Sequence, residues 1–406
     1  MQFGGIDEAG LGPLLGPLSA AACRSDVTPT LLQSLLEELS IWPGPKKGAS
    51  TQPTLAQDQG VRTVADSKVI YRNRSDFARL EQLALTLYFA STAGTGTGPA
   101  AQMAKDSDKA RINKVHSNNG LDAGATESGS LHPSDIFSEA ECSELRKIPW
   151  YQGLFAPGER LPAAADADII RATAATLAQN LQLRDWHISL DGLLIAEPEY
   201  NRKIALYDNK SLVLRELIAQ LLRNYTEWPG NRNTAELFPE SSPEESLKEC
   251  DIVEAHCVEA HCTVDRLGGL KHYLPWLQTV FGRAGTTDDL FAEMDSTAKT
   301  SGTPTWDIKK IREEPHCSEY LFSGKQSLPF RLLFRVKGDR RNILCAIASI
   351  WAKYRRELLM RQLNSYWQQQ VPNLPTTSGY YQDAQVFLKV LRESLPNLPE
   401  NLRRSR

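Results

Sequence analysis

Apolar and polar positions follow regular periods along much of the chain. Residues 2–23 are apolar and glycine-rich and are broken by Pro13 and Pro17, which predicts a strand, a turn and a second strand. Apolar residues three or four positions apart predict helices over 31–39 and from about residue 75 onward. The buried stripe of the second helix is supplied by Leu80, Leu83 and Leu87.

Two helix-to-strand units follow one another in the middle of the chain. A helix over 166–181 leads into a strand over 186–197, and a helix over 210–225 leads through a polar loop into a strand over 252–265. This alternation is typical of an α/β sheet. The rest of the pattern predicts a helix over 270–281, strands over 318–324 and 329–338, and helices over 341–369 and 384–395.

Three stretches lack the apolar residues of a core. Residues 91–130 consist largely of small and polar residues and cannot bury enough surface to offset the entropy lost on ordering, so we expect a mobile low-complexity insertion there. Residues 226–246 and 285–304 are predicted loop insertions. We expect one domain over 1–406, whose last part, 370–406, is a C-terminal helical extension.

Composition narrows the class of protein further. With 406 residues, 41% hydrophobic and 23% charged, the chain is long enough to bury a large core. No stretch approaches the roughly 20 consecutive apolar residues of a membrane helix, and the N-terminus lacks a secretory pattern. The seven cysteines are odd in number and widely spread, unlike those of a secreted disulfide scaffold. We therefore expect a soluble cytoplasmic protein with reduced thiols and no membrane partner.

A basic segment spans residues 331–361, although the net charge of the chain is −3. Its cations far outnumber its two acids, Asp339 and Glu357. A solvated helix face and a phosphate-binding surface both fit this pattern. Phosphate contact is favoured because these cations follow Asp339, which is a candidate metal ligand for the reasons given next. The cations concerned are Arg340, Arg341, Lys353 and Arg356.

Four aspartates follow apolar segments that are predicted to be strands: Asp7, Asp191, Asp265 and Asp339. Ligands of α/β sheets gather where strands end, so we expect several of these carboxylates to share one site. Like charges packed together raise one another's pKa unless a cation neutralises them, and carboxylate oxygens suit Mg²⁺ or Mn²⁺. Two such ions can cleave a phosphodiester, because one activates water and the other stabilises the leaving oxygen.

Glu8 directly follows Asp7, which constrains the backbone. Successive side chains of a strand point to opposite faces, so both carboxylates reach one site only if the strand ends or bulges at Glu8. Ala9 and Gly10 come next, and glycine accepts unusual backbone angles at little cost. We therefore expect the strand to end or bulge at Glu8.

The repeated segment VEAHCVEAHC brings His256, Cys257, His261 and Cys262 close in sequence. Zinc ligation is one interpretation, but neighbouring strand residues face opposite ways and the spacing fits no common zinc finger. We favour a tandem duplication within a buried strand. The aromatic residues of the long predicted helix are assigned to the core: Trp351, Tyr354 and Trp367.

Four motifs, in order, resemble the type 2 ribonucleases H (ribonuclease HII). The first, GIDEAGLGPLLGP at 5–17, is similar to that family's G-[IV]-D-E-A-G-R-G-P-x-x-G-P. The others are ADSK at 65–68, KGD followed by NILCAIASIWAKYRRE at 337–357, and TSGYYQD at 377–383. The resemblance covers the first strands, one helix and the C-terminal quarter, and leaves the middle of this long chain uncovered.

The resemblance implies a ribonuclease H-like α/β fold, a mixed sheet flanked by helices and carrying long loop insertions. It implies a metal-dependent endonuclease, with two Mg²⁺ or Mn²⁺ ions, that hydrolyses the RNA strand of RNA–DNA hybrids or ribonucleotide-containing DNA and leaves 5'-phosphate and 3'-hydroxyl ends. We expect a monomer. Four acids hold the metals in that family, and Asp7, Glu8 and Asp339 carry over directly.

The remaining acid has two candidates. Asp191 lies in SLDG, which is similar to the family's V-D-G after a helix. Asp265 follows a segment that is similar to the family's strand, P-E-x-x-N and helix, and it is nearer Asp339 in sequence. A glycine pair after Asp265 also allows a tight turn that keeps the site open. We favour Asp265 and keep Asp191 as the alternative.

The resemblance also implies a set of substrate-binding residues. Tyr380 matches a tyrosine that lies under the sugar at the RNA–DNA junction, and Lys68 would lie near the metals or the scissile phosphate. A family arginine is replaced by Leu11, which has no hydrogen-bond donor, while the flanking glycines keep their backbone amides. The full set is Gly10, Leu11, Gly12, Lys68, Lys353 and Tyr380.

Two other functions remain open for this sequence. Leu11 and the insertions fit a catalytically altered nucleic-acid-binding protein on the same fold. A nuclease for other structured nucleic acids is the second alternative. The retained acids favour an enzyme, because buried like charges are costly without a metal.

Overall fold

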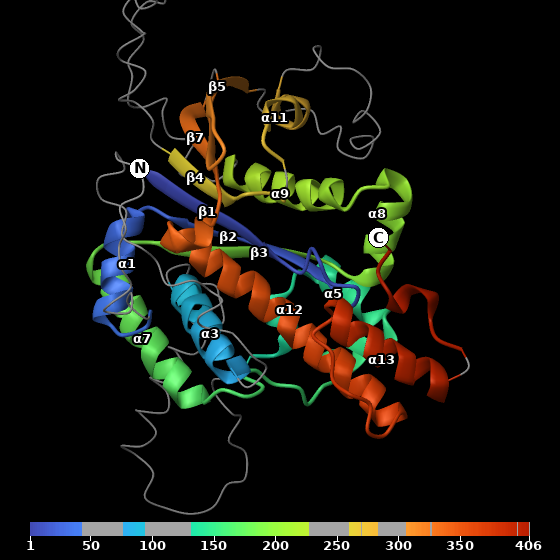
Figure 1. Ribbon diagram of the computed structural model, residues 1–406. Helices are drawn as coiled ribbons and strands as arrows, with labels where there is room; N and C mark the ends of the chain where they lie inside the picture. The colour runs from blue at the N-terminus through green and yellow to red at the C-terminus, as the bar shows by residue number, and fades with distance from the viewer. Residues whose placement is uncertain are drawn as a thin grey trace, which may run out of the picture.

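A seven-stranded mixed sheet with helices on both faces organises the protein (Figure 1). The computed structural model describes residues 1–42, 76–93, 131–226, 260–268, 270–282, 306–324, 327–395 and 397–405. The strands lie in the order β3-β2-β1-β4-β7-β6-β5. Their bounds are β1 Gln2–Ala9, β2 Leu18–Ser25, β3 Ile188–Ile195, β4 Ala260–Asp265, β5 Asp307–Glu313, β6 Cys317–Gly324 and β7 Ser327–Arg335.

The centre of the sheet combines antiparallel and parallel pairing. β1 runs antiparallel to β2, with Ile6 opposite Ala22, and parallel to β4, with Ile6 opposite Val264. β7 is parallel to β4 on its other side. β5 and β6 extend this edge as antiparallel strands. The carboxyl ends of β1, β4 and β7 therefore meet at one edge of the sheet.

Helices cover the two faces with separate hydrophobic cores. The small residues Ala21 and Cys23 of β2 belong to one core, and Ala20 and Ala22 belong to the other, as the alternation of a strand requires. The first core includes α1 Pro29–Glu38, α3 Phe77–Ala93, α7 Ala167–Leu183 and α12 Ile343–Gln370. The second includes α8 Glu197–Tyr207, α9 Lys210–Thr226 and α11 Leu274–Phe281. Figure 1 shows α12 and α9 on opposite sides of the sheet.

Further helices and 3-10 turns complete the described chain. They are α5 Glu139–Arg146, α6 Pro149–Gln152, α13 Tyr381–Ser394, and the 3-10 turns η2 Pro133–Ile136, η3 Gly153–Phe155, η6 Gly338–Arg340 and η7 Glu400–Leu402. α13 follows α12, and the C-terminus lies beside α8 (Figure 1). No helix among the described residues is long and apolar enough to cross a membrane.

The start of α12 lies directly against β1. A Cβ atom on Gly5 would come within 2.2 Å of the backbone nitrogen of Cys345, so only glycine permits this approach. The side chain of Asn342 caps the helix by accepting a hydrogen bond from the Leu344 N–H at 2.9 Å. The Cys345 thiol donates to the Thr263 carbonyl of β4 at 3.1 Å. Strands β1 and β4 are thereby fixed against the first turn of α12.

The structure confirms the predicted α/β architecture of a mixed sheet flanked by helices. Most predicted elements lie within a few residues of their observed bounds, and the aromatic residues assigned to the core are buried: Trp351, Tyr354 and Trp367. The sequence pattern missed β5, whose exposed positions hide its alternation, and the helices α5, α6 and α8. Residues 94–130, 227–246 and 285–304, which hold most of the predicted insertions, lie outside the described residues.

Candidate active site

Asp7 and Asp265 lie on neighbouring parallel strands at the same edge of the sheet. The last pair of the β1–β4 ladder is Ile6 with Val264, and Asp7 and Asp265 are the next residues of the two strands. Ile6 and Val264 belong to the core beneath α9, so the next residue of each strand faces the α12 side. The two charges interact, because Asp265 raises the pKa of Asp7.

Asp339 reaches the same place from the turn between β7 and α12. Gly338 of η6 donates its N–H to Oδ1 of Asp265 at 2.7 Å. Lys337, immediately before it, adopts a left-handed conformation with φ 57° and so turns the chain sharply out of β7. Asp339 is buried and also raises the pKa of Asp7.

The electrostatic environment of Asp7 is unfavourable to its charge. Burial raises the pKa of Asp7 well above its usual value, and the charges of Glu8, Asp265 and Asp339 raise it further, while a hydrogen bond with Ser349 of α12 lowers it. Like charges this close favour neutralisation by a proton or a cation. Ser349, which the sequence analysis did not single out, therefore supports the ionised form of Asp7.

The donor set suits a hard divalent cation, since the clustered side chains offer carboxylate oxygens. Among the described residues, however, no three His, Cys, Asp or Glu side chains are arranged to hold a metal ion as they stand. A metal at this cluster would therefore require side chains to turn toward a common point.

Glu8 departs from the expected backbone. β1 continues through Glu8 to Ala9, and its register with β2 is unbroken from Phe3–Ser25 to Ala9–Ser19, so the prediction of a strand end or bulge at Glu8 is wrong. The small side chains of β2 let the ladder continue, and the chain turns only at Gly10, where φ is 94°. Glu8 follows the alternation of β1 and starts on the face opposite Asp7.

Asp191 lies apart from the cluster. It is the fourth of the eight residues of β3, not a strand-end residue as predicted, and it stands opposite Ala22 in the β2–β3 ladder. Ala22 belongs to the core beneath α9, so Asp191 faces away from Asp7. Its Oδ2 atom accepts hydrogen bonds from Arg24 at 3.2 Å and from Asn224 at 3.0 Å. The structure thus brings Asp265, and not Asp191, to Asp7.

The glycine loop, residues 10–17 between β1 and β2, contacts the segment that carries Tyr380. Gly379 accepts hydrogen bonds at its carbonyl from the N–H groups of Leu14 at 2.7 Å and Leu15 at 3.2 Å. Gly379 has φ 86°, and a Cβ atom there would lie 2.3 Å from the Leu15 carbonyl oxygen. Tyr380, 55% exposed, therefore stands beside the loop that contains Gly10.

Arg356 joins these two segments from α12. It is 2% exposed and donates to the carbonyls of Ser378 at 2.8 Å and Leu15 at 3.5 Å, and its guanidinium lies 5.7 Å from the centre of the Tyr380 ring. The interpretation of Arg356 as a phosphate-contacting or solvated cation is wrong, because the side chain is buried and its Nη1 and Nη2 atoms donate to groups inside the protein. Lys353 lies one turn from Ser349 on α12, between the carboxylates and Arg356.

Leu11 and Gly12 occupy the outer part of the glycine loop. Leu11 is half-buried and packs against the core beneath α9, so its side chain takes a structural place where an arginine would offer donors. A Cβ atom on Gly12 would meet nothing within 4 Å. The backbone at Gly12 is therefore open to an approaching ligand.

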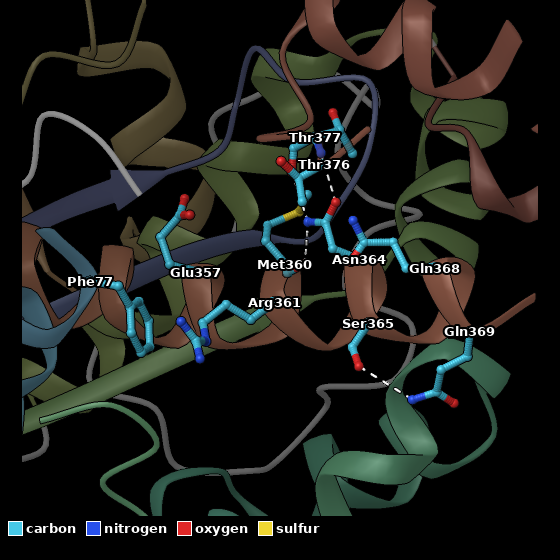
Figure 2. Close-up of a pocket in the computed structure, with 10 residues that line it drawn as sticks. All are labelled: Phe77, Glu357, Met360, Arg361, Asn364, Ser365, Gln368, Gln369, Thr376 and Thr377. Atoms are coloured by element: carbon cyan, nitrogen blue, oxygen red, sulfur yellow. Dashed lines mark hydrogen bonds between the residues drawn. The ribbon is translucent and has the colours of Figure 1, made fainter. Parts of the chain in front are cut away.

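A hollow of about 460 Å³ lies along α12 (Figure 2). Asn364 lines it, donating to the Thr377 carbonyl at 2.9 Å and accepting from the Thr377 N–H at 2.7 Å. These bonds fix the chain three residues before Tyr380. The Arg361 guanidinium, also in the lining, lies 4.4 Å from the centre of the Phe77 ring. No pattern in the sequence predicts this hollow.

The predicted residues that remain are Lys68 and those of the VEAHCVEAHC repeat. Lys68 lies outside the described residues, as do His256 and Cys257. His261 and Cys262 are successive residues of β4 and face opposite sides of the sheet, and Cys262 is buried in the core. The three described residues of the repeat, 260–262, therefore fit a strand of the sheet rather than a zinc site.

Comparisons with known proteins give structural similarities at low sequence identity. No protein-family model matches the chain, and no curated protein matches it. The chain is similar to a chain in the structure of the PCNA:RNase HII complex from Archaeoglobus fulgidus, with 14% identity, a TM-score of 0.38, and coverage of 100% of this chain and 95% of that one. It is also similar to ribonuclease H2 from Pyrococcus horikoshii, with 12% identity, a TM-score of 0.33, and coverage of 100% and 92%. Similarity at this level transfers no residue role to this chain.

Proposed function

We propose that this protein is a metal-dependent endonuclease that hydrolyses the RNA strand of RNA–DNA hybrids or of ribonucleotide-containing DNA, acting as a monomer in the cytoplasm. The observation that carries the proposal is the group of acids around the buried Asp7. Asp265 reaches Asp7 from β4 and Asp339 reaches it from the turn η6, and their charges raise the pKa of Asp7 together with burial. Burial and mutual repulsion of these carboxylates cost folding free energy, and a bound cation offsets that cost.

Asp7, Asp265 and Asp339 would hold Mg²⁺ or Mn²⁺, with Glu8 turning toward them from the end of β1. Bound in this way, two ions supply an activated water and charge stabilisation at the leaving oxygen, which yields 5'-phosphate and 3'-hydroxyl ends. Ser349 orients Asp7 through its hydrogen bond. The Gly338 N–H orients Asp265 in the same manner.

The neighbouring elements supply a place for the substrate backbone. Tyr380 is exposed beside the glycine loop and offers a ring face to a sugar. The backbone amides of Gly10, Leu11 and Gly12 offer donors that need no side chain. Lys353 lies on α12 between these groups and the carboxylates and suits a phosphate. Lys68 belongs to the same proposed set through its motif.

A nucleic-acid-binding protein with altered catalysis is the second candidate. Two observations favour it: the half-buried Leu11 offers no donor at the loop, and the carboxylates do not converge on a metal as they stand. A nuclease for other structured nucleic acids would use the same carboxylates on a different substrate.

A cleavage assay separates these functions. The protein is incubated with an RNA–DNA hybrid, a DNA duplex containing one ribonucleotide, and an all-DNA duplex, each with Mn²⁺, Mg²⁺ or EDTA. We expect metal-dependent cutting at ribonucleotides, with the ends stated above. Binding without cutting of any substrate would favour the altered binding protein, and cutting confined to all-DNA substrate would contradict the ribonuclease proposal.

A further inference from the structure

Arg404, near the C-terminus, lies against the glycine loop although almost 400 residues separate them in sequence. Its side chain is 1% exposed. Nη1 donates to the Gly10 carbonyl at 2.5 Å and to the Gly16 carbonyl at 3.5 Å, and Nη2 donates to the Leu11 carbonyl at 3.2 Å. One guanidinium therefore contacts the backbone at both ends of the loop.

The tail that carries Arg404 is itself fixed. The Arg404 N–H donates to the Leu14 carbonyl at 2.8 Å, so the tail pairs with the middle of the loop. Asn201 of α8 brackets Arg404, because its Nδ2 donates to the Arg403 carbonyl at 2.8 Å and its Oδ1 accepts from the Ser405 N–H at 2.7 Å. The guanidinium also lies 3.8 Å from the centre of the Tyr200 ring, a cation–π contact.

The direction of these bonds determines where the loop amides point. In a trans peptide the carbonyl of one residue and the N–H of the next point in opposite directions. Because the Gly10 and Leu11 carbonyls point to Arg404, the N–H groups of Leu11 and Gly12 point away from it. Open space around Gly12 lets a ligand approach on that side.

We propose that Arg404 is a positioning residue, which turns the Leu11 and Gly12 amides outward so that they can bind phosphate or hydroxyl oxygens of a nucleic-acid backbone. The ligand in this inference rests on the proposed function. The clamp, meaning the bonds from the Arg404 guanidinium to the carbonyls of Gly10, Leu11 and Gly16, rests on the contacts of Arg404 alone. Leu11 lacks a donor side chain, so the loop depends on its backbone, and the orientation of that backbone depends on Arg404.

Two variants of the full-length chain test the clamp, Arg404→Gln and its exposed neighbour Arg403→Gln as the matched control. Hydrogen–deuterium exchange of a peptide covering residues 6–18 is the first measurement, because it requires no activity. We expect faster exchange in Arg404→Gln and none of this change in Arg403→Gln. Equal exchange in both variants and the unmodified protein would overturn the clamp.

Substrate affinity is the second measurement. The dissociation constant for an RNA–DNA hybrid, measured by fluorescence anisotropy without divalent cations, should rise about tenfold in Arg404→Gln, equivalent to about 1.4 kcal/mol. Where cleavage is observed, KM should rise while kcat changes less, and Arg404→Lys should restore part of the affinity. If Arg404→Gln speeds exchange of residues 6–18 but leaves the affinity for the hybrid unchanged, the clamp stands and the amide binding site is refuted. If Arg404→Gln leaves exchange unchanged and the protein still cleaves the hybrid, the clamp is refuted and the proposed function stands.

Asn201→Ala provides an independent route to the same state. Its side chain holds the tail on both sides of Arg404, through the Arg403 carbonyl and the Ser405 N–H. We expect the same faster exchange of residues 6–18 and the same loss of affinity, to a smaller extent. If residues 6–18 of Asn201→Ala exchange as slowly as in the unmodified protein, the Asn201 bonds are not needed to hold Arg404 against the loop.

Discussion

Asp7 of β1 and Asp265 of β4 stand side by side, one residue beyond the paired residues Ile6 and Val264. Both face the start of α12, and burial together with neighbouring charges raises the pKa of Asp7 well above its usual value. The same register excludes Asp191, which is two strands away on the opposite face. The placement of the acids therefore follows from strand pairing rather than from sequence distance.

Metal binding should be visible in thermal unfolding. Without divalent cations, Asp265→Asn should raise the midpoint by about 1–3 °C, because it removes a like charge beside Asp7 while Asn keeps the acceptor for the Gly338 N–H. Mg²⁺ or Mn²⁺ should stabilise the unmodified protein and have little effect on the variant. Equal stabilisation of both proteins by the metals would place the metal elsewhere.

Two glycines of the proposed binding surface should respond differently to alanine. Gly379→Ala requires a side chain at φ 86° with its Cβ 2.3 Å from the Leu15 carbonyl oxygen, and should cost about 2 kcal/mol or more of unfolding free energy. Gly12→Ala meets open space and should cost less than about 1 kcal/mol. Urea unfolding measures both, and equal losses would contradict the packing of the Gly379 segment on the loop.

Tyr380 and Tyr381 form a matched pair, since they are adjacent and 55% and 54% exposed. The Tyr380 ring lies 5.7 Å from the Arg356 guanidinium that joins its segment to the glycine loop. Tyr380→Ala should weaken binding of an RNA–DNA hybrid by about 1–3 kcal/mol through lost stacking, and Tyr381→Ala should leave it within about twofold. A larger loss for Tyr381→Ala would move the proposed sugar-binding face away from Tyr380.

Glu197 should make stability fall as pH rises. Burial raises the pKa of Glu197 above its usual value of 4.5, although it accepts hydrogen bonds from Tyr151 at 2.8 Å and the Gly16 N–H at 3.2 Å. The folded state then binds more protons than the unfolded state, so stability is lost from about pH 4.5 upward through the folded pKa. Glu197→Gln should therefore be more stable than the unmodified protein at pH 8, with the difference shrinking toward pH 4.5.

Glu199, on the same helix, gives the opposite sign and serves as the control. A hydrogen bond from Arg202 is the main reason that its pKa lies below the usual value. Its contribution to stability is present above pH 4.5 and is lost as pH falls through the folded pKa. Glu199→Gln should be slightly less stable at pH 8. A gain in both variants would show that burial of Glu197 is not the cause.

The sequence predicts the architecture and much of the site because its evidence is local. Apolar periodicity marks β1, β2, α9 and α12, and the motifs mark Asp7, Asp339 and Tyr380 as candidates. The choice between Asp265 and Asp191 depends on which strands pair and which face each residue takes, and a sequence alone does not contain that register.

Other contacts could not be predicted for physical reasons. Arg404 and Asn364 act on backbone carbonyls and amides brought near them by tertiary packing, and such partners leave no motif in the chain. Ser349 is one small residue in the apolar first turns of α12, and its hydrogen bond with Asp7 depends on how closely α12 approaches β1 at Gly5. The continuation of β1 through Glu8 depends in turn on its pairing with the small residues of β2.

The most direct test of the central claim compares two conservative variants in one cleavage assay. Asp265→Asn and Asp191→Asn are each incubated with an RNA–DNA hybrid in Mn²⁺ and in Mg²⁺, and initial rates are compared with those of the unmodified protein. The account predicts a loss of at least about 100-fold for Asp265→Asn and a rate within about threefold for Asp191→Asn. Retained cleavage by Asp265→Asn, or its abolition by Asp191→Asn, would contradict it.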